Sequence, residues 1–112
     1  MIKKGMIVMD SGTMLFMEKP YKIMDIQDTK RNTRTDGRYP LRIGSIIEFV
    51  YPFIPMKGIV ALFSYIKDNE GNEKQGTLRT STIQKIYNDE EDSSILIIET
   101  LNSIYILKQE EE

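Results

Sequence analysis

Residues 57–67 read KGIVALFSYIK, and this stretch decides the fold class. Residues 59–63 form a continuous apolar run of strand length, which is typical of a β-strand buried on both faces. One face of that strand carries Ile59, Ala61, Phe63 and Tyr65. The opposite face carries Val60 and Leu62, so we expect a central strand that is covered on both sides.

The composition of the whole chain extends this prediction. The 112 residues include one alanine, 17 isoleucines, three valines and eight threonines. β-Branched residues favour strands, whereas alanine is the best helix former. Turn-forming residues separate runs of strand length, and DNEGN at residues 68–72 fits a hairpin loop with Gly71 at positive φ. We therefore predict an all-β fold without a helix, a small barrel or sandwich of about seven to eight mostly antiparallel strands, similar in size to SH3 or OB domains.

The length fits one domain, because a chain of this size can close one hydrophobic core but not two. We expect residues 1–112 to form a single β-rich domain with a basic loop near residues 28–42 and a frayed acidic tail over residues 108–112. Charge is unevenly distributed along the chain. Residues 1–42 hold nine Lys or Arg against five Asp or Glu, whereas residues 87–112 hold one against eight.

Cysteine and histidine are both absent from the sequence. Their absence excludes disulfides, the usual zinc sites, and triads that use an imidazole base or a thiolate nucleophile. The sequence also lacks the glycine-rich motifs that bind nucleotide phosphates in the common nucleotide-binding folds. We expect a protein with no catalytic residue, no metal site and no cofactor.

The one local concentration of unusual chemistry is RNTRTDGRYPLR at residues 31–42, which holds four of the five arginines of the chain. Guanidinium groups match phosphate and carboxylate in a two-pronged geometry, so the segment predicts a site that binds an anion or a nucleic acid. Tyr39 is suited either to stack a base or to pack an arginine. The predicted binding residues are Lys30, Arg31, Arg34, Arg38, Tyr39 and Arg42.

Methionine is concentrated near the N-terminus. Flexible thioethers form adaptable contact surfaces, and they fill irregular cores equally well. In a strand, Met14 and Met17 fall on opposite faces, as do Met6 and Met9, so some of them should be exposed. We predict a partner surface that includes these four methionines.

Three functions of different classes follow from these features. The preferred one is a non-enzymatic binding protein, of phage or mobile-element origin, that engages a protein or nucleic acid through the basic loop and the methionine-rich surface. The first alternative is a binder that sequesters an anionic small molecule such as a nucleotide. The second is a metal-dependent phosphodiesterase in which Asp10 and Asp28 hold Mg²⁺ and Lys30 orients the attacking water. Homo-oligomerisation is left open.

The N-terminal segment resembles a secretory signal only superficially. Its apolar run at residues 5–9 ends at Asp10 and is too short for a signal peptide. No stretch approaches the roughly 18 to 20 apolar residues that span a bilayer. We therefore expect a cytoplasmic protein with no membrane partner.

Overall fold

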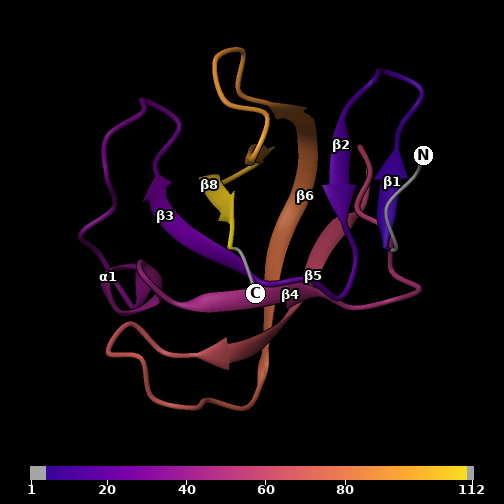
Figure 1. The fold of residues 1–112 in the computed structure, drawn as a ribbon. Coiled ribbons are helices and arrows are strands. Elements are labelled where there is room, and N and C mark those ends of the chain that lie inside the picture. The colour runs from indigo at the N-terminus through magenta and orange to yellow at the C-terminus, as the bar shows by residue number, and fades with distance from the viewer. Residues whose placement is uncertain (1–4, 111–112) are drawn as a thin grey trace.

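The structure, a computed structural model, describes residues 5–110 and consists almost entirely of strands (Figure 1). The strands are β1 (Met6–Val8), β2 (Met14–Phe16), β3 (Tyr21–Gln27), β4 (Ile46–Phe49), β5 (Val60–Lys67), β6 (Thr77–Asn88), β7 (Ile95–Thr100) and β8 (Ile104–Gln109). The predicted all-β class is confirmed. One correction applies within the basic loop, where Tyr39–Arg42 forms a one-turn helix, α1, that was not predicted. Its second residue is Pro40, whose fixed φ suits the first turn of a helix.

Six of the strands form a closed antiparallel barrel in the order β3-β4-β5-β6-β7-β8, and β1 and β2 form a separate two-stranded sheet. The barrel closes through β3, which pairs with β4 on one side and with β8 on the other. Closure removes the unpaired sheet edges that would otherwise invite association with other chains. Among the described residues, no helix is long and apolar enough to cross a membrane.

Irregular register gives the strands the curvature that a small barrel needs. The ladder between β3 and β8 shifts between Ile23 and Asp25, and the ladders of β4 with β5, β5 with β6, and β6 with β7 each contain a similar shift. Bulges of this kind bend a strand and increase its twist. In β3 the bulge also allows Ile23 and Ile26 both to be buried, although strict alternation would place them on opposite faces.

The barrel interior is filled mainly by aliphatic side chains around two phenylalanines. The ring centroids of Phe49 and Phe63 lie 4.7 Å apart, and Tyr21 meets Phe49 edge-on at 5.6 Å. Within residues 57–67, Phe63 is buried as predicted, but Ile59 precedes β5 and is exposed. Val60 and Leu62, on the opposite face of β5, are only partly buried, so the strand is not covered equally on both sides as predicted.

The C-terminal strand is longer than predicted. β8 continues through Gln109, although the frayed tail was predicted to begin at residue 108. The amide of Glu110 then donates a hydrogen bond to the carbonyl of Pro20 at 2.9 Å. Strand pairing therefore extends into the predicted tail, and residues 111–112 lie outside the described part of the chain.

Two loops, one after β3 and one after β5, have the same hydrogen-bonding pattern. In each, the amide of an aspartate donates to the carbonyl of an asparagine four residues later, at 2.9 Å for Asp28 and Asn32 and at 2.8 Å for Asp68 and Asn72. The aspartate carboxylate accepts bonds from the amides two and four residues on. These backbone bonds hold the pKa of Asp68 below its ordinary value.

The fourth position of each loop requires positive φ. Gly71 supplies it in the second loop, as predicted, with φ of 86°, whereas Arg31 adopts φ of 68° in the first. Each loop then returns to its strand in the same way, since the amide of Arg34 donates to Ile26 and that of Lys74 donates to Ile66. The two loops thus deliver one cation each to corresponding positions.

The core makes a direct prediction about stability. Phe49→Ala removes a ring that is fully buried between two others, so we expect a loss of about 3–5 kcal/mol in the free energy of unfolding. The matched control is Phe53→Ala, because Phe53 is 58% exposed and its removal should change stability by no more than about 0.5 kcal/mol. Denaturant titration measures both. Equal losses from the two variants would contradict the assigned core.

Candidate functional site

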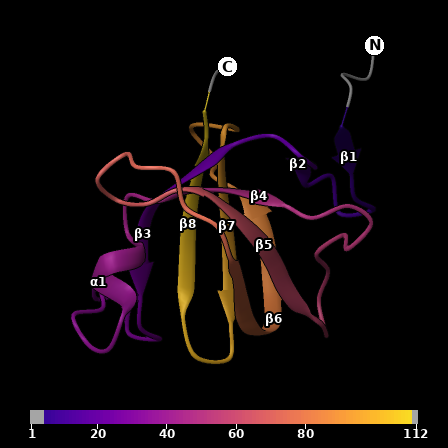
Figure 2. The ribbon, with the colours of Figure 1, turned by 90° about the horizontal axis from the view of Figure 1, so that it is seen from below.

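Cationic side chains gather at the end of the barrel beside α1. Figures 1 and 2 both place α1 and the loop between β5 and β6 on one side of the molecule, and β1 and β2 on the other. Between α1 and the start of β6 lies a cleft of about 400 Å³. Four cations line it, Arg38, Arg42, Lys74 and Arg79, together with Tyr65. We call it the cationic cleft.

The four cations of the cleft have little compensation from nearby carboxylates, the one recorded being a longer-range attraction between Lys74 and Asp68. No aspartate or glutamate belongs to the lining, and within residues 5–110 none of the four forms an ion pair. Arg38, Lys74 and Arg79 are exposed, and Arg42 is partly buried. Positive charge that is not ion-paired on a concave surface raises the local concentration of anions, even on a chain with a net charge of −2.

Tyrosine rings contact two of the four cleft cations, Arg42 and Lys74, and also contact Arg34. The guanidinium carbon of Arg42 lies 5.4 Å from the ring centroid of Tyr39, and that of Arg34 lies 4.6 Å from the same ring. The amino nitrogen of Lys74 lies 4.2 Å from the ring centroid of Tyr65. Cation–π contacts of this kind orient a positive group without neutralising it. Tyr39 therefore packs arginines, which was one of its two predicted roles.

The hydroxyls of Tyr65 and Tyr105 lie near the cations of the cleft. Burial raises the pKa of Tyr65, and the nearby Arg42 partly offsets that increase. Burial also raises the pKa of Tyr105 to about 12, with a smaller contribution from Tyr39. Both phenols consequently stay neutral over the physiological pH range and do not reduce the positive charge of the cleft.

Arg34 has a different role from Arg38 and Arg42. Its guanidinium donates to the Asp36 carboxylate at 3.1 and 3.3 Å, to the Ser103 hydroxyl at 3.0 Å and to the carbonyl oxygen of Asn102. The side chain is only 18% exposed. Arg34 thus ties the basic loop to the turn between β7 and β8, and its charge is already compensated.

The remaining two predicted cations lie outside the cleft. Arg31 forms an ion pair with Glu99 at 3.6 Å, and Glu99 also accepts a 2.5 Å hydrogen bond from the Tyr87 hydroxyl. Lys30 is exposed in the first of the two related loops and does not line the cleft. Of the predicted binding residues, the structure therefore brings together Arg38, Tyr39 and Arg42.

Lys74, Arg79 and the polar residues 75–77 of the site were missed from the sequence, and Tyr65 was not among the predicted binding residues. A signal for Lys74 does exist. IQDTKRNTR at residues 26–34 and IKDNEGNEK at residues 66–74 share isoleucine, aspartate and asparagine at equivalent positions, and both end in a cation. Nothing local marks Arg79, which lies on an ordinary strand.

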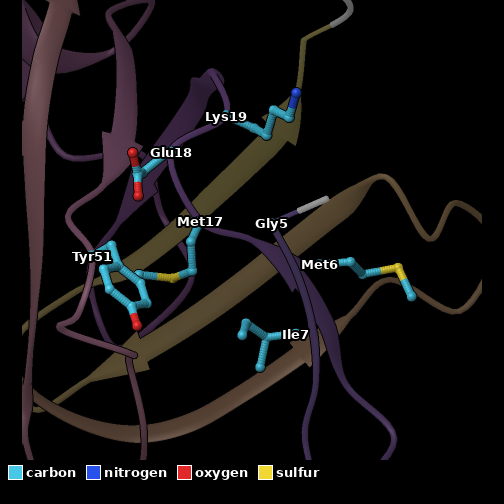
Figure 3. Close-up of a pocket in the computed structure, with 7 residues that line it drawn as sticks. All are labelled: Gly5, Met6, Ile7, Met17, Glu18, Lys19 and Tyr51. Atoms are coloured by element: carbon cyan, nitrogen blue, oxygen red, sulfur yellow. The ribbon is translucent and has the colours of Figure 1, made fainter. Parts of the chain in front are cut away.

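The four predicted partner-surface methionines do not form a common patch. Met17 is buried in the core at 4% exposure, Met6 and Met9 are partly buried, and Met14 is 37% exposed. Figure 3 shows Met17 pointing toward Tyr51 and Met6 pointing away from it, across a groove of about 460 Å³. The methionines therefore divide between core and surface.

Exposed apolar side chains do gather at this end of the molecule, though most are not methionine. They come from β1, β2 and the segment between β4 and β5, which lie together on the side away from α1 (Figures 1 and 2). We call this surface the apolar end; it comprises Val8, Met14, Tyr51, Phe53, Met56 and Ile59.

β1 has one free edge. The bonds from Met17 to Gly5 and from Met9 to Thr13 fix the phase of the β1–β2 ladder, so the amides and carbonyls of Met6 and Val8 point away from β2. Within residues 5–110 no other strand pairs with β1. An edge of this kind can accept another strand.

The outer edge of β2, by contrast, is closed. The Asn88 side chain accepts a bond from the Met14 amide and donates one to its carbonyl, both at 2.8 Å. The Tyr21 hydroxyl accepts a bond from the Phe16 amide at 3.0 Å. These side chains use the backbone groups that a further strand would need. The small sheet can therefore grow only from β1.

The residues of the phosphodiesterase alternative are not brought together. Asp10 lies in the turn between β1 and β2, whereas Asp28 begins the loop after β3, on the other side of the molecule in Figure 1. The Asp28 carboxylate is moreover bonded to the amides of Lys30 and Asn32. No group of three or more acidic side chains suited to a metal ion occurs in the described residues.

The divided roles of the arginines predict different effects on stability. Arg34→Ala removes charge-assisted bonds from a largely buried group, so we expect a loss of about 1–3 kcal/mol in the free energy of unfolding. Arg38→Ala is the control and should change stability by less than about 0.5 kcal/mol. Thermal and denaturant unfolding measure both. A larger loss from Arg38→Ala would refute the division.

Comparisons with models of known protein families, with curated proteins and with solved structures found no match.

Proposed function

We propose that this chain is a non-enzymatic binding protein that receives a phosphate-bearing ligand in the cationic cleft. The observation that carries the proposal is the set of four cations around one concavity whose lining contains no carboxylate. If the basic loop were only a solvated connection, nothing would favour placing its cations beside the cations of the separate β5–β6 hairpin. Here Arg38 and Arg42 of the basic loop face Lys74 and Arg79 from the β5–β6 region.

Phosphate suits the other groups of the lining as well. Gln75 and Gly76 border the cleft, and within residues 5–110 no group accepts a hydrogen bond from their amides. Thr77 adds a hydroxyl to the same border. Backbone amides and hydroxyls are common donors to phosphate oxygens, and guanidinium groups bind them in a two-pronged geometry.

Nucleic acid is the first candidate ligand, because spaced cations suit a chain of phosphates. A nucleotide is the second candidate. It is favoured by the volume of the cleft, about 400 Å³, which is typical of small-molecule sites. Salt dependence separates the two, since affinity for a nucleic acid falls with a logarithmic slope of roughly −0.7 to −0.9 per phosphate contacted.

Removing the cleft cations should weaken binding without unfolding the protein. We expect Arg38→Gln combined with Arg79→Gln to lower affinity for single-stranded nucleic acid and to reduce the salt slope by roughly 0.7 for each phosphate that the variant no longer neutralises. Both side chains are exposed, so the fold should be retained. The matched control is Lys57→Gln with Lys85→Gln, which removes the same charge beside the apolar end.

Fluorescence anisotropy across a range of salt concentrations measures these affinities. An equal loss of affinity in the control pair would mean that the effect depends only on the net charge of the protein. If neither nucleic acid nor nucleotide binds the unmodified protein, the proposed ligand class is wrong.

The apolar end supports a second binding surface, for a protein partner that adds a strand to β1. Val8 is 53% exposed and lies opposite Met14 in the ladder, so both project from the same face of the small sheet. An open edge beside apolar side chains matches recognition by strand addition, in which the backbone supplies affinity and neighbouring side chains supply specificity. A second copy of the chain would supply such a strand as well.

Hydrogen exchange tests whether this edge is open. In dilute protein the amides of Met6 and Val8 should exchange faster than those of Ile7 and Met9, because only the latter pair donates to β2. Selective slowing of Met6 and Val8 as protein concentration rises, together with dimer formation in sedimentation, would identify the second copy as partner. Equal protection of all four amides in the monomer would mean that the edge is already closed.

A further inference from the structure

We infer that the cationic cleft recognises consecutive phosphate groups of its ligand and does not read the bases. This inference rests on the proposed function and names the chemistry of its ligand more narrowly. The shared ligand chemistry is a run of phosphates, which both a nucleoside triphosphate and a nucleic-acid backbone present. The tyrosines of the site then act as positioning residues for the cations.

The main support is that the aromatic rings of the site are already in use. Proteins that hold unpaired bases do so on open aromatic faces. Beside this cleft, Tyr39 is covered by the guanidinium groups of Arg34 and Arg42, and Tyr65 by the ammonium group of Lys74. Tyr105 is buried at 3% exposure. Each of these rings is thus in contact with a cation or buried, which leaves less ring surface on which a base could stack.

The polar groups of the lining also favour phosphate over base edges. The cations and the amides at residues 75 and 76 are donors only, whereas reading a base edge generally needs donors and acceptors in a matched pattern. Gln75 is the one lining side chain with both an amide donor and an amide acceptor. It is exposed at the border of the cleft. The hydroxyls of Thr77 and Tyr65 also donate and accept, but Gln75 alone presents a paired amide donor and acceptor, so it is the first residue to test for a base preference.

Tyr65 also orients the ammonium group of Lys74, and substitutions at Tyr65 test this positioning role. Lys74 is exposed and has a long, flexible stem, so the ring of Tyr65 limits the directions in which its ammonium group points. Tyr65→Phe keeps that ring and removes only the hydroxyl, which is bonded to Arg42, so it should weaken affinity less than removal of the whole ring. Tyr65→Leu removes it and should weaken phosphate binding by about two- to fivefold, equally for every base.

The experiment uses the full chain and four kinds of probe: inorganic tripolyphosphate, the four ribonucleoside triphosphates, homopolymeric single strands of about twelve nucleotides, and an abasic strand of the same length. We expect the four triphosphates to bind within about threefold of one another, and likewise the single strands, because no contact discriminates their bases. The abasic strand should bind as well as the others, tripolyphosphate should compete with them, and Gln75→Ala should change none of these ratios. Tighter binding of strands than of triphosphates identifies nucleic acid as the source of the phosphates, and the reverse identifies a nucleotide.

Several results would overturn the inference while leaving the proposed function intact. They are a preference of about tenfold or more for one base, loss of binding by the abasic strand, or failure of tripolyphosphate to compete. A base preference that disappears in Gln75→Ala would locate the error in that side chain. If Tyr65→Phe weakened binding as much as Tyr65→Leu, the hydroxyl would be the important group and the positioning role would be wrong. Absence of binding by every probe would instead remove the proposed function and this inference with it.

Discussion

The pairing of β3 with two partners is the constraint on which the rest of the structure depends. β3 follows β8 along nearly its whole length, whereas its ladder with β4 covers Tyr21 and Lys22. Pairing continues at Ile23, whose amide donates to the carbonyl of Ser45 and whose carbonyl accepts from the amide of Gly44. Beyond Ile23 the two strands diverge, and the carbonyl of Ile26 accepts instead from the amide of Arg34. The basic loop and α1 therefore occupy the gap where β4 leaves β3. The cationic cleft lies beside α1, at the end of the closed barrel where β3 and β4 part.

Several cations lie close together beside α1, where they repel one another, and they are stabilised in two ways. Arg34 is compensated by Asp36 and by groups of the β7–β8 turn, so it stabilises the loop. Arg42 and Lys74 instead contact tyrosine rings. A carboxylate would stabilise a cation by cancelling its charge, whereas a ring stabilises it while leaving the charge available to a ligand. This contrast explains why Arg34 stabilises the loop, whereas the charges of Arg42 and Lys74 are available to a ligand.

The two ends of the molecule differ in the kind of contact that they favour. The end beside α1 is cationic and concave, whereas the end formed by β1, β2 and the β4–β5 segment exposes apolar side chains and an edge of β1 that no other strand within residues 5–110 pairs with. Charge on a concave surface favours anions, and apolar side chains beside an open edge favour a polypeptide. The barrel separates these surfaces, so occupation of one leaves the other accessible (Figure 2).

The sequence by itself determined the fold class, the core face of β5 around Phe63, the hairpin loop at Gly71 and the concentration of arginines near α1, because each of these depends on local composition, spacing or turn chemistry. Only the tertiary structure decided between barrel and sandwich, since both bury the same alternating pattern. It also separated Arg34 from Arg38 and joined Lys74 and Arg79 to the basic loop. Those outcomes depend on strand register, bulges and the divergence of β3 from β4, which bring together segments about forty residues apart through pairings that no local pattern records.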